Sequence, residues 1–248
     1  MSYRSGNPSL NSRTFQNLER PSGSHLLRDD VMTIQGTVDK TGISLALLIF
    51  AGYFAYVPNG LIYMITGFIG GLIVAIVTIY KKTWAPITVP LYAMFEGLLL
   101  GSISYMYGQM YEGIVLNAII LTVSILISLL FVYKSGLIKV TENFKLGVAA
   151  ATGGIALVYL FSIFGSFFGI NISFLDSTNG SLMSIGISLF IVIIASLNLV
   201  MDFDFIEEGA DRGAPKYMEW YGAFGLLVTL VWLYLEILRL LSKLNSRK

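Results

Sequence analysis

The sequence contains no cysteine and only one histidine, His25, among its 248 residues. Disulfides, thiolate metal sites and cysteine nucleophiles are therefore excluded, and the apolar part of the chain cannot hold a serine–histidine triad or a histidine proton relay. Charge is also scarce, since Asp, Glu, Lys and Arg make up 12% of the residues, against about 25% in globular chains. The formal net charge is +1, so no overall field attracts nucleic acid, and we expect no nucleic-acid partner.

Hydrophobic residues, in contrast, make up 55% of the chain. About 20 mainly apolar residues are needed to cross the hydrocarbon core of a bilayer, and seven stretches qualify: 42–58, 60–80, 86–107, 113–133, 146–170, 182–204 and 219–242. We therefore predict an all-α, polytopic membrane protein whose residues 41–248 form one bundle of seven transmembrane helices. Residues 1–40 are polar and lack the apolar core of a secretory signal, and we expect a disordered tail followed by a short lead-in.

Basic residues are concentrated in alternate connections. They precede the first predicted span and follow the second, fourth and sixth, whereas the other loops contain no Lys or Arg. By the positive-inside rule, the amino terminus is predicted to be cytoplasmic. The carboxyl end breaks the pattern with four basic residues: Arg239, Lys243, Arg247 and Lys248. Either this end lies outside the cell or the last segment crosses incompletely, and charge counting leaves both open.

Few ionisable residues lie within the predicted spans. A charge at the bilayer centre costs about 2.5–3.5 kcal/mol on insertion scales, so such residues usually mark a pathway or a partner. The candidates are Glu96 in the third span, Asp202 and Asp204 at the end of the sixth, and Glu236 and Arg239 in the seventh. Glu96 lies near mid-depth, and we expect it to point into the bundle rather than towards lipid.

Helical periodicity separates the two aspartates. At about 100° per residue, Asp202 shares one side of its helix with small and polar residues: Ser184, Ser188, Ala195 and Asn198. This row is predicted to face other helices. Asp204 lies on the far side and is expected at the membrane interface.

The last span carries a longer polar stripe, which predicts a helix buried at the centre of the bundle. Its members are Gly222, Gly225, Thr229, Trp232, Glu236 and Arg239. The spacing of Glu236 and Arg239 also fits a simple ion pair that reaches towards the interface. Between the last two spans, acids and bases alternate with Gly and Pro, and we expect a solvated hairpin loop that includes Glu207, Glu208 and Asp211.

Three stretches resemble the Bax inhibitor-1/YccA family, and in particular its bacterial branch with a long polar amino tail. They are "NLVMDFDFIEEGADRGAPKYMEWYGAFGLLVTLVWLYLEILRLLSKL" (198–244), "PLYAMFEGLLLGSIS" (90–104) and "MTIQGTVDKTGISL" (32–45). The resemblance implies a bacterial inner-membrane protein in which six helices surround the seventh. It also implies a pH-sensitive calcium leak controlled by an acidic pair, which by position is Asp202 or Asp204 with Glu236.

The sequence departs from this family at three points. The acid of helix seven is Glu rather than the usual Asp, the connection between the acids is longer, and residues 60–80 contain no arginine to match the one that latches the closed pore. If both helices turn near Gly213, Asp202 and Glu236 are not level, and Glu96 becomes a candidate substitute partner.

Two main functions are compatible with these patterns, and a proton-coupled small-molecule transporter, which substrate-dependent proton uptake would reveal, stays open as a third. The first is a pH-sensitive cation leak, in which protonated acids hold the helices together and ionised acids repel each other and offer oxygen ligands to calcium. In that reading no cofactor is bound, calcium passes Asp202 and Glu236 transiently, Asn198 and Thr229 line the route, and Arg239 is a counter-charge. The alternative is a non-conducting membrane regulator that binds a membrane protease or another complex. We expect no enzymatic activity, because the Gly-x-Gly-Asp arrangement of intramembrane aspartyl proteases is absent.

Overall fold

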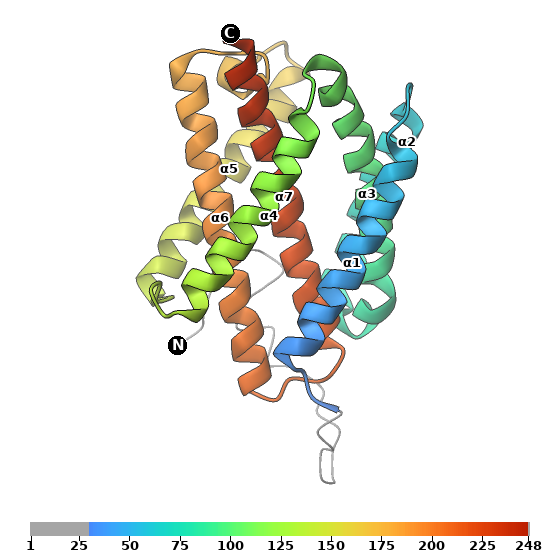
Figure 1. The fold of residues 1–248 in the computed structure, drawn as a ribbon, viewed down its shortest axis with the longest axis vertical. Helices are drawn as coiled ribbons and strands as arrows, with labels where there is room; N and C mark the ends of the chain where they lie inside the picture. Colours follow the sequence, from blue (N-terminus) through green and yellow to red (C-terminus); the bar gives the residue numbers. More distant parts are fainter. Residues whose placement is uncertain (1–29, 248) are drawn as a thin grey trace.

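The computed structural model describes residues 30–247, in which seven long helices run roughly along one axis (Figure 1). They are α1 (Ile34–Ala55), α2 (Leu61–Tyr80), α3 (Ala85–Met110), α4 (Ile114–Lys134), α5 (Glu142–Ser166), α6 (Leu182–Asp211) and α7 (Met218–Ser246), with short 3-10 helices η3 (Lys82–Trp84) and η4 (Ser173–Leu175). Within the described residues, all seven long helices have the length and apolar composition of membrane spans. The predicted all-α, seven-span architecture is confirmed, while residues 1–29 of the tail and lead-in predicted over residues 1–40 lie outside the described residues.

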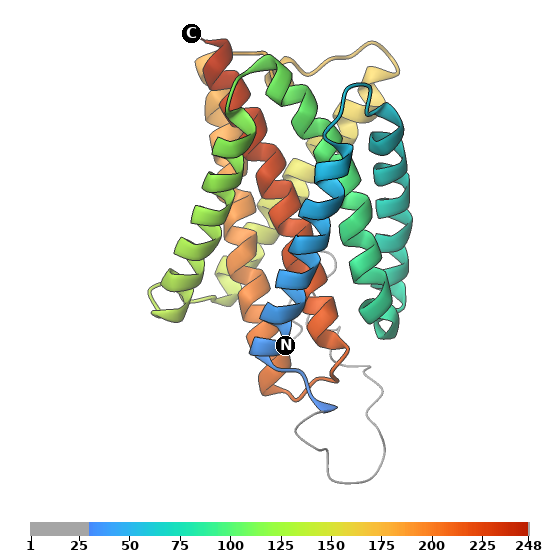
Figure 2. The ribbon, with the colours of Figure 1, turned by 45° about the vertical axis from the view of Figure 1, so that its right-hand side comes forward.

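Helix α7 occupies the centre of the bundle. It contacts α1, α3, α4 and α6, and it passes behind α4 and beside α6 in both ribbon views (Figures 1 and 2). In its most apolar stretch 67% of the residues are buried, against 11–22% for α1, α2, α4 and α5. This burial confirms the prediction drawn from the polar stripe, since a helix with polar groups at membrane depth must direct them towards protein.

Glycine contacts hold α3 tightly between α1 and α2. A Cβ on Gly97 or Gly101 would overlap backbone atoms of α1, and one on Gly67 would come within 2.6 Å of backbone atoms of α3. These glycines therefore act as close-approach sites between the helices.

Helix α1 begins at Ile34, eight residues before the predicted span. Thr33 caps it by accepting a hydrogen bond from the Gly36 N–H. Further along, the buried hydroxyl groups of Thr37 and Thr41 donate to the carbonyl oxygens four residues earlier. Because these side chains satisfy themselves inside the helix, a polar segment can pack against the bundle as a regular helix.

Helix α6 is also longer than predicted and continues to Asp211. The acids that we expected in a solvated loop, Glu207, Glu208 and Asp211, therefore belong to its last turns, and that prediction was wrong. Two of these acids have partners that support the helix, since Arg212 pairs with Glu208 and the Tyr133 hydroxyl donates to Glu207. The turn itself is short because Gly213 adopts a left-handed φ of 63° and ends the helix.

The two ends of the bundle differ in charge. The start of α1 lies at the same end as the α2–α3, α4–α5 and α6–α7 connections, which carry the loop lysines and arginines (Figure 2). The carboxyl end of α7 lies at the opposite end. At about 1.5 Å per residue, the 29 residues of α7 span roughly 43 Å, so the last helix is long enough for a complete crossing.

We predict that Gly101→Ala destabilises the bundle by about 1–3 kcal/mol, the usual cost of overpacking. The added methyl group would overlap the carbonyl oxygen of Gly52 and force α1 away from α3. Chemical unfolding of the detergent-solubilised protein measures this change. The matched control is Gly153→Ala, where a Cβ has no neighbour within 4 Å; equal stability of the two variants would contradict the prediction.

Candidate functional site

Glu236 lies at the centre of a charged network that joins α7 to α5. Its side chain is almost fully buried, with 1% of the residue exposed. The Tyr159 hydroxyl of α5 donates to Glu236 Oε1 at 2.5 Å. Arg239 Nη1 donates to both carboxylate oxygens, at 2.8 and 2.9 Å, and to the Tyr159 oxygen at 2.7 Å. The predicted i,i+3 ion pair therefore exists, and Tyr159 ties it to a second helix; its carboxylate is enclosed by protein, whereas the Arg239 side chain is 25% exposed.

Lys243 continues this charged row one turn beyond Arg239. Its side chain is fully buried, and its Nζ donates to the Phe174 carbonyl oxygen at 2.6 Å and to Ser188 Oγ at 2.8 Å. These bonds attach the end of α7 to α6 and to η4. Two of the four basic residues at the carboxyl end, Arg239 and Lys243, thus serve the bundle interior and are not charges of an extramembrane tail.

Asp202 is fully buried, with 0% of the residue exposed. The row that it shares on α6 is buried throughout, as the periodicity predicted. In that row, the Asn198 amide donates to Thr152 Oγ1 of α5 at 2.8 Å. Counted from the α6–α7 turn at about 1.5 Å per residue, Glu236 lies on the order of 15 Å farther along the bundle than Asp202, so the structure does not bring these two acids together.

Asp204 faces a different partner. Its Oδ2 lies 2.6 Å from Lys145 Nζ, at the beginning of α5. The lysine side chain is 10% exposed and that of Asp204 is 26% exposed, so the pair lies at the edge of the bundle. With a fixed counter-charge on α5, Asp204 is not directed towards α7 or Glu236.

Glu96 is partly buried between α3 and α2. A Cβ built on Gly71 of α2 would lie 3.1 Å from its Oε1, and the Tyr92 hydroxyl on the preceding turn of α3 is its hydrogen-bond neighbour. Glu96 therefore faces α2, whereas Glu236 faces α5. Glu96 therefore does not take the place of Asp202 as a partner of Glu236, a possibility that the sequence had suggested.

A further buried acid, Glu219, lies at the end of the bundle near the α6–α7 turn. Glu219 is 1% exposed, and its Oε1 accepts hydrogen bonds from the Thr33 N–H at 3.1 Å and the Thr33 hydroxyl at 2.9 Å. Lys216 Nζ lies 3.0 Å from the same oxygen. The segment before α1 is thereby fixed to the start of α7.

Sequence reasoning missed four members of these networks: Tyr159, Lys243, Lys145 and Glu219. Lys243 could have been found, because seven residues after Glu236 a helix has returned to the same face. The others gave no signal, since a lone tyrosine in an apolar span and charges beside loops are common on any membrane helix.

Among proteins of curated function, none matches this chain. A family model described as "Bax inhibitor 1 like" matches residues 7–246. The chain belongs to the Bax inhibitor-1-like family. In this Bax inhibitor-1-like protein the ionisable residues of α6 and α7 are buried in separate clusters, and across residues 30–247 no three His, Asp or Glu side chains gather in a way that could hold a metal ion.

We predict that Tyr159→Phe lowers the free energy of unfolding by about 1.5–3 kcal/mol, the usual contribution of hydrogen bonds to charged groups. The lost hydroxyl bridges Glu236 and Arg239. Combining it with Glu236→Gln should give less than the sum of the two single effects, because both changes break the same network. Tyr53→Phe is the control, since Tyr53 is 78% exposed, and additive effects in the double variant would contradict the prediction.

Proposed function

We propose that this Bax inhibitor-1-like protein is a pH-sensitive cation leak, with calcium as its ion, in the inner membrane of a bacterium. The amino terminus is cytoplasmic in this proposal, in line with the sorted basic loops. The observation that carries it is the buried charged network on α7, because ionisable groups enclosed in a membrane bundle usually serve a pathway. Calcium is the preferred ion because it binds carboxylate and carbonyl oxygens.

The proposed route follows the polar face of α7 between α5 and α6. Counted from the α6–α7 turn, Asp202 comes first, Thr229 on α7 and Asn198 on α6 follow within about one helical turn, and Glu236 stands at the far level. All four are buried. Because the two acids are separated along the bundle, a cation would pass them one after the other, and each contact would be transient.

Glu236 is the proposed pH sensor. When ionised, it neutralises Arg239 and, through Tyr159, holds α7 against α5. Protonation would remove the ion pair and release this attachment, so acidification favours the open state at Glu236. This sign differs from the expectation of two mutually repelling acids, and the Arg239 counter-charge is the reason.

We predict that Glu236→Gln, which imitates the protonated acid, raises calcium flux severalfold at neutral pH and weakens its dependence on pH. Asp202→Asn removes a buried carboxylate from the route and is expected to lower flux at every pH. Calcium entry into liposomes that contain the purified protein and an internal calcium dye, measured from pH 6 to pH 8, tests both.

Glu112→Gln is the matched control, because Glu112 is exposed and should leave flux unchanged. Wild-type flux no greater than that of empty liposomes, or flux indifferent to pH in all variants, would contradict the proposal. Absence of flux together with capture of a stable membrane-protease partner would support the alternative, a non-conducting regulator.

A further inference from the structure

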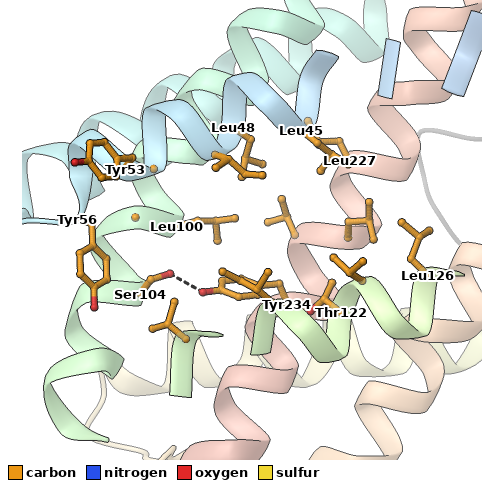
Figure 3. A pocket seen from close by; sticks show the side chains of 18 residues that line it. Leu45, Leu48, Tyr53, Tyr56, Leu100, Ser104, Thr122, Leu126, Leu227 and Tyr234 are labelled. Carbon is orange, nitrogen blue, oxygen red and sulfur yellow. Dashed lines mark hydrogen bonds between the residues drawn. The ribbon is translucent and has the colours of Figure 1, made fainter. Parts of the chain in front are cut away.

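A cleft of about 470 Å³ lies on the side of α7 that faces α1, α3 and α4. Figure 3 shows Leu45 and Leu48 of α1 on one side of it and Thr122 and Leu126 of α4 on the other, with Tyr234 of α7 beside Thr122. The polar face of α7 instead turns towards α5, where Glu236 meets Tyr159. The cleft is therefore separate from the proposed ion route and does not depend on it.

The cleft suits an apolar occupant. Its lining is almost entirely aliphatic and aromatic, and the innermost hydroxyl groups, those of Ser104 and Tyr234, bond to each other at 2.7 Å. The Thr122 hydroxyl donates a hydrogen bond to the Ala118 carbonyl oxygen. A buried water needs two to four polar partners, and a hydrated ion needs more, so this lining offers little to either.

The cleft is continuous with the lipid-facing surface of the bundle. Its rim consists of exposed apolar residues on α1 and α4: Ile49 (67%), Tyr53 (78%), Ile119 (45%) and Val123 (47%). Its inner wall is the buried helix α7, where Leu227 is 0% and Leu230 is 5% exposed. Because bilayer lipid covers the rim, the molecules with direct access to the cleft are lipids.

The length of the cleft matches one leaflet. On α1 it extends from Leu45 to Tyr56, and on α4 from Val115 to Leu126; at about 1.5 Å per residue each distance is roughly 16 Å. Half of a hydrocarbon core of about 30 Å is about 15 Å. Tyr53 and Tyr56 mark one end, and tyrosines favour the level of the lipid headgroups.

We propose that this cleft holds one acyl chain of a bilayer phospholipid, with the carbonyl end beside Tyr56 and the methyl end beside Leu45, Leu126 and Leu227. Moving from the surrounding lipid into the cleft gives the acyl chain no favourable hydrophobic free energy, because both environments are apolar. Binding is favoured because the chain fills a space whose walls otherwise lack dispersion contacts on one side.

The test uses the full-length protein in liposomes of phosphatidylcholine that carries a photoreactive diazirine on one acyl chain. After illumination, mass spectrometry locates the labelled peptides. A diazirine near the terminal methyl should label α7 around Leu227 and Leu230, which lipid can reach only through the cleft. A diazirine near the carbonyl should instead label the end of the cleft that contains Tyr56 and Ser104.

Filling the entrance with Ile119→Trp and Val123→Trp should remove most of the α7 labelling. The control pair is Ile120→Trp and Ile127→Trp, two lipid-facing positions of α4 outside the cleft, and it should leave the labelling intact. The dependence of the label on diazirine position in the wild type tests the proposal even where the filled variant fails to fold.

Three outcomes would overturn the proposal. The first is labelling confined to the outer faces of the bundle, such as that of α2. The second is α7 labelling that is independent of where the diazirine sits on the acyl chain. The third is cross-linking of two protein chains through the cleft, which would assign it to a second copy of the protein.

Discussion

Helix α7 places three charged residues within two turns, Glu236, Arg239 and Lys243, and still occupies the middle of a membrane bundle. An unpaired charge at that depth costs about 2.5–3.5 kcal/mol on insertion scales. The arrangement is stable because Arg239 neutralises Glu236, Tyr159 accepts from one and donates to the other, and Lys243 is bound by the Phe174 carbonyl oxygen and by Ser188. These bonds link α7 to α5, α6 and η4 and thereby help to fix the positions of those elements around it.

The side of α7 that faces away from α5 is apolar. Towards α1, α3 and α4 it presents Leu227, Leu230 and Tyr234, which border an apolar cleft. The tight glycine contacts of α3 with α1 and α2 make those three helices one packed unit. Polar contacts hold α7 to α5, α6 and η4, whereas close glycine contacts hold α1, α2 and α3 together. Because α7 contacts both groups of helices, a change on either side alters its packing.

Much of the fold could be predicted because its signals are local and long. Span length defines the seven helices, and a row of polar residues on one face predicts the burial of α7 and of Asp202. The partners could not be predicted, because they depend on the relative height of helices that are distant in sequence. Tyr159 meets Glu236 and Lys145 meets Asp204 only because α5 packs beside α6. The end of α6 was misjudged for a related reason, since Arg212 and Tyr133 make a run of acids compatible with a helix.

The offset between Asp202 and Glu236 follows from the length of α6 and α7 on either side of Gly213. An acid nine residues before the end of one helix cannot be level with an acid eighteen residues into the next, unless the turn is displaced by several residues. The left-handed Gly213 and the bond from the Ala214 N–H to the Gly209 carbonyl oxygen fix that turn. In the proposed leak, a change at Glu236 would therefore act first on α5 through Tyr159, and it would reach Asp202 only through movement of α7 as a whole. Under that proposal, α7 rather than a shared proton would couple the two acids.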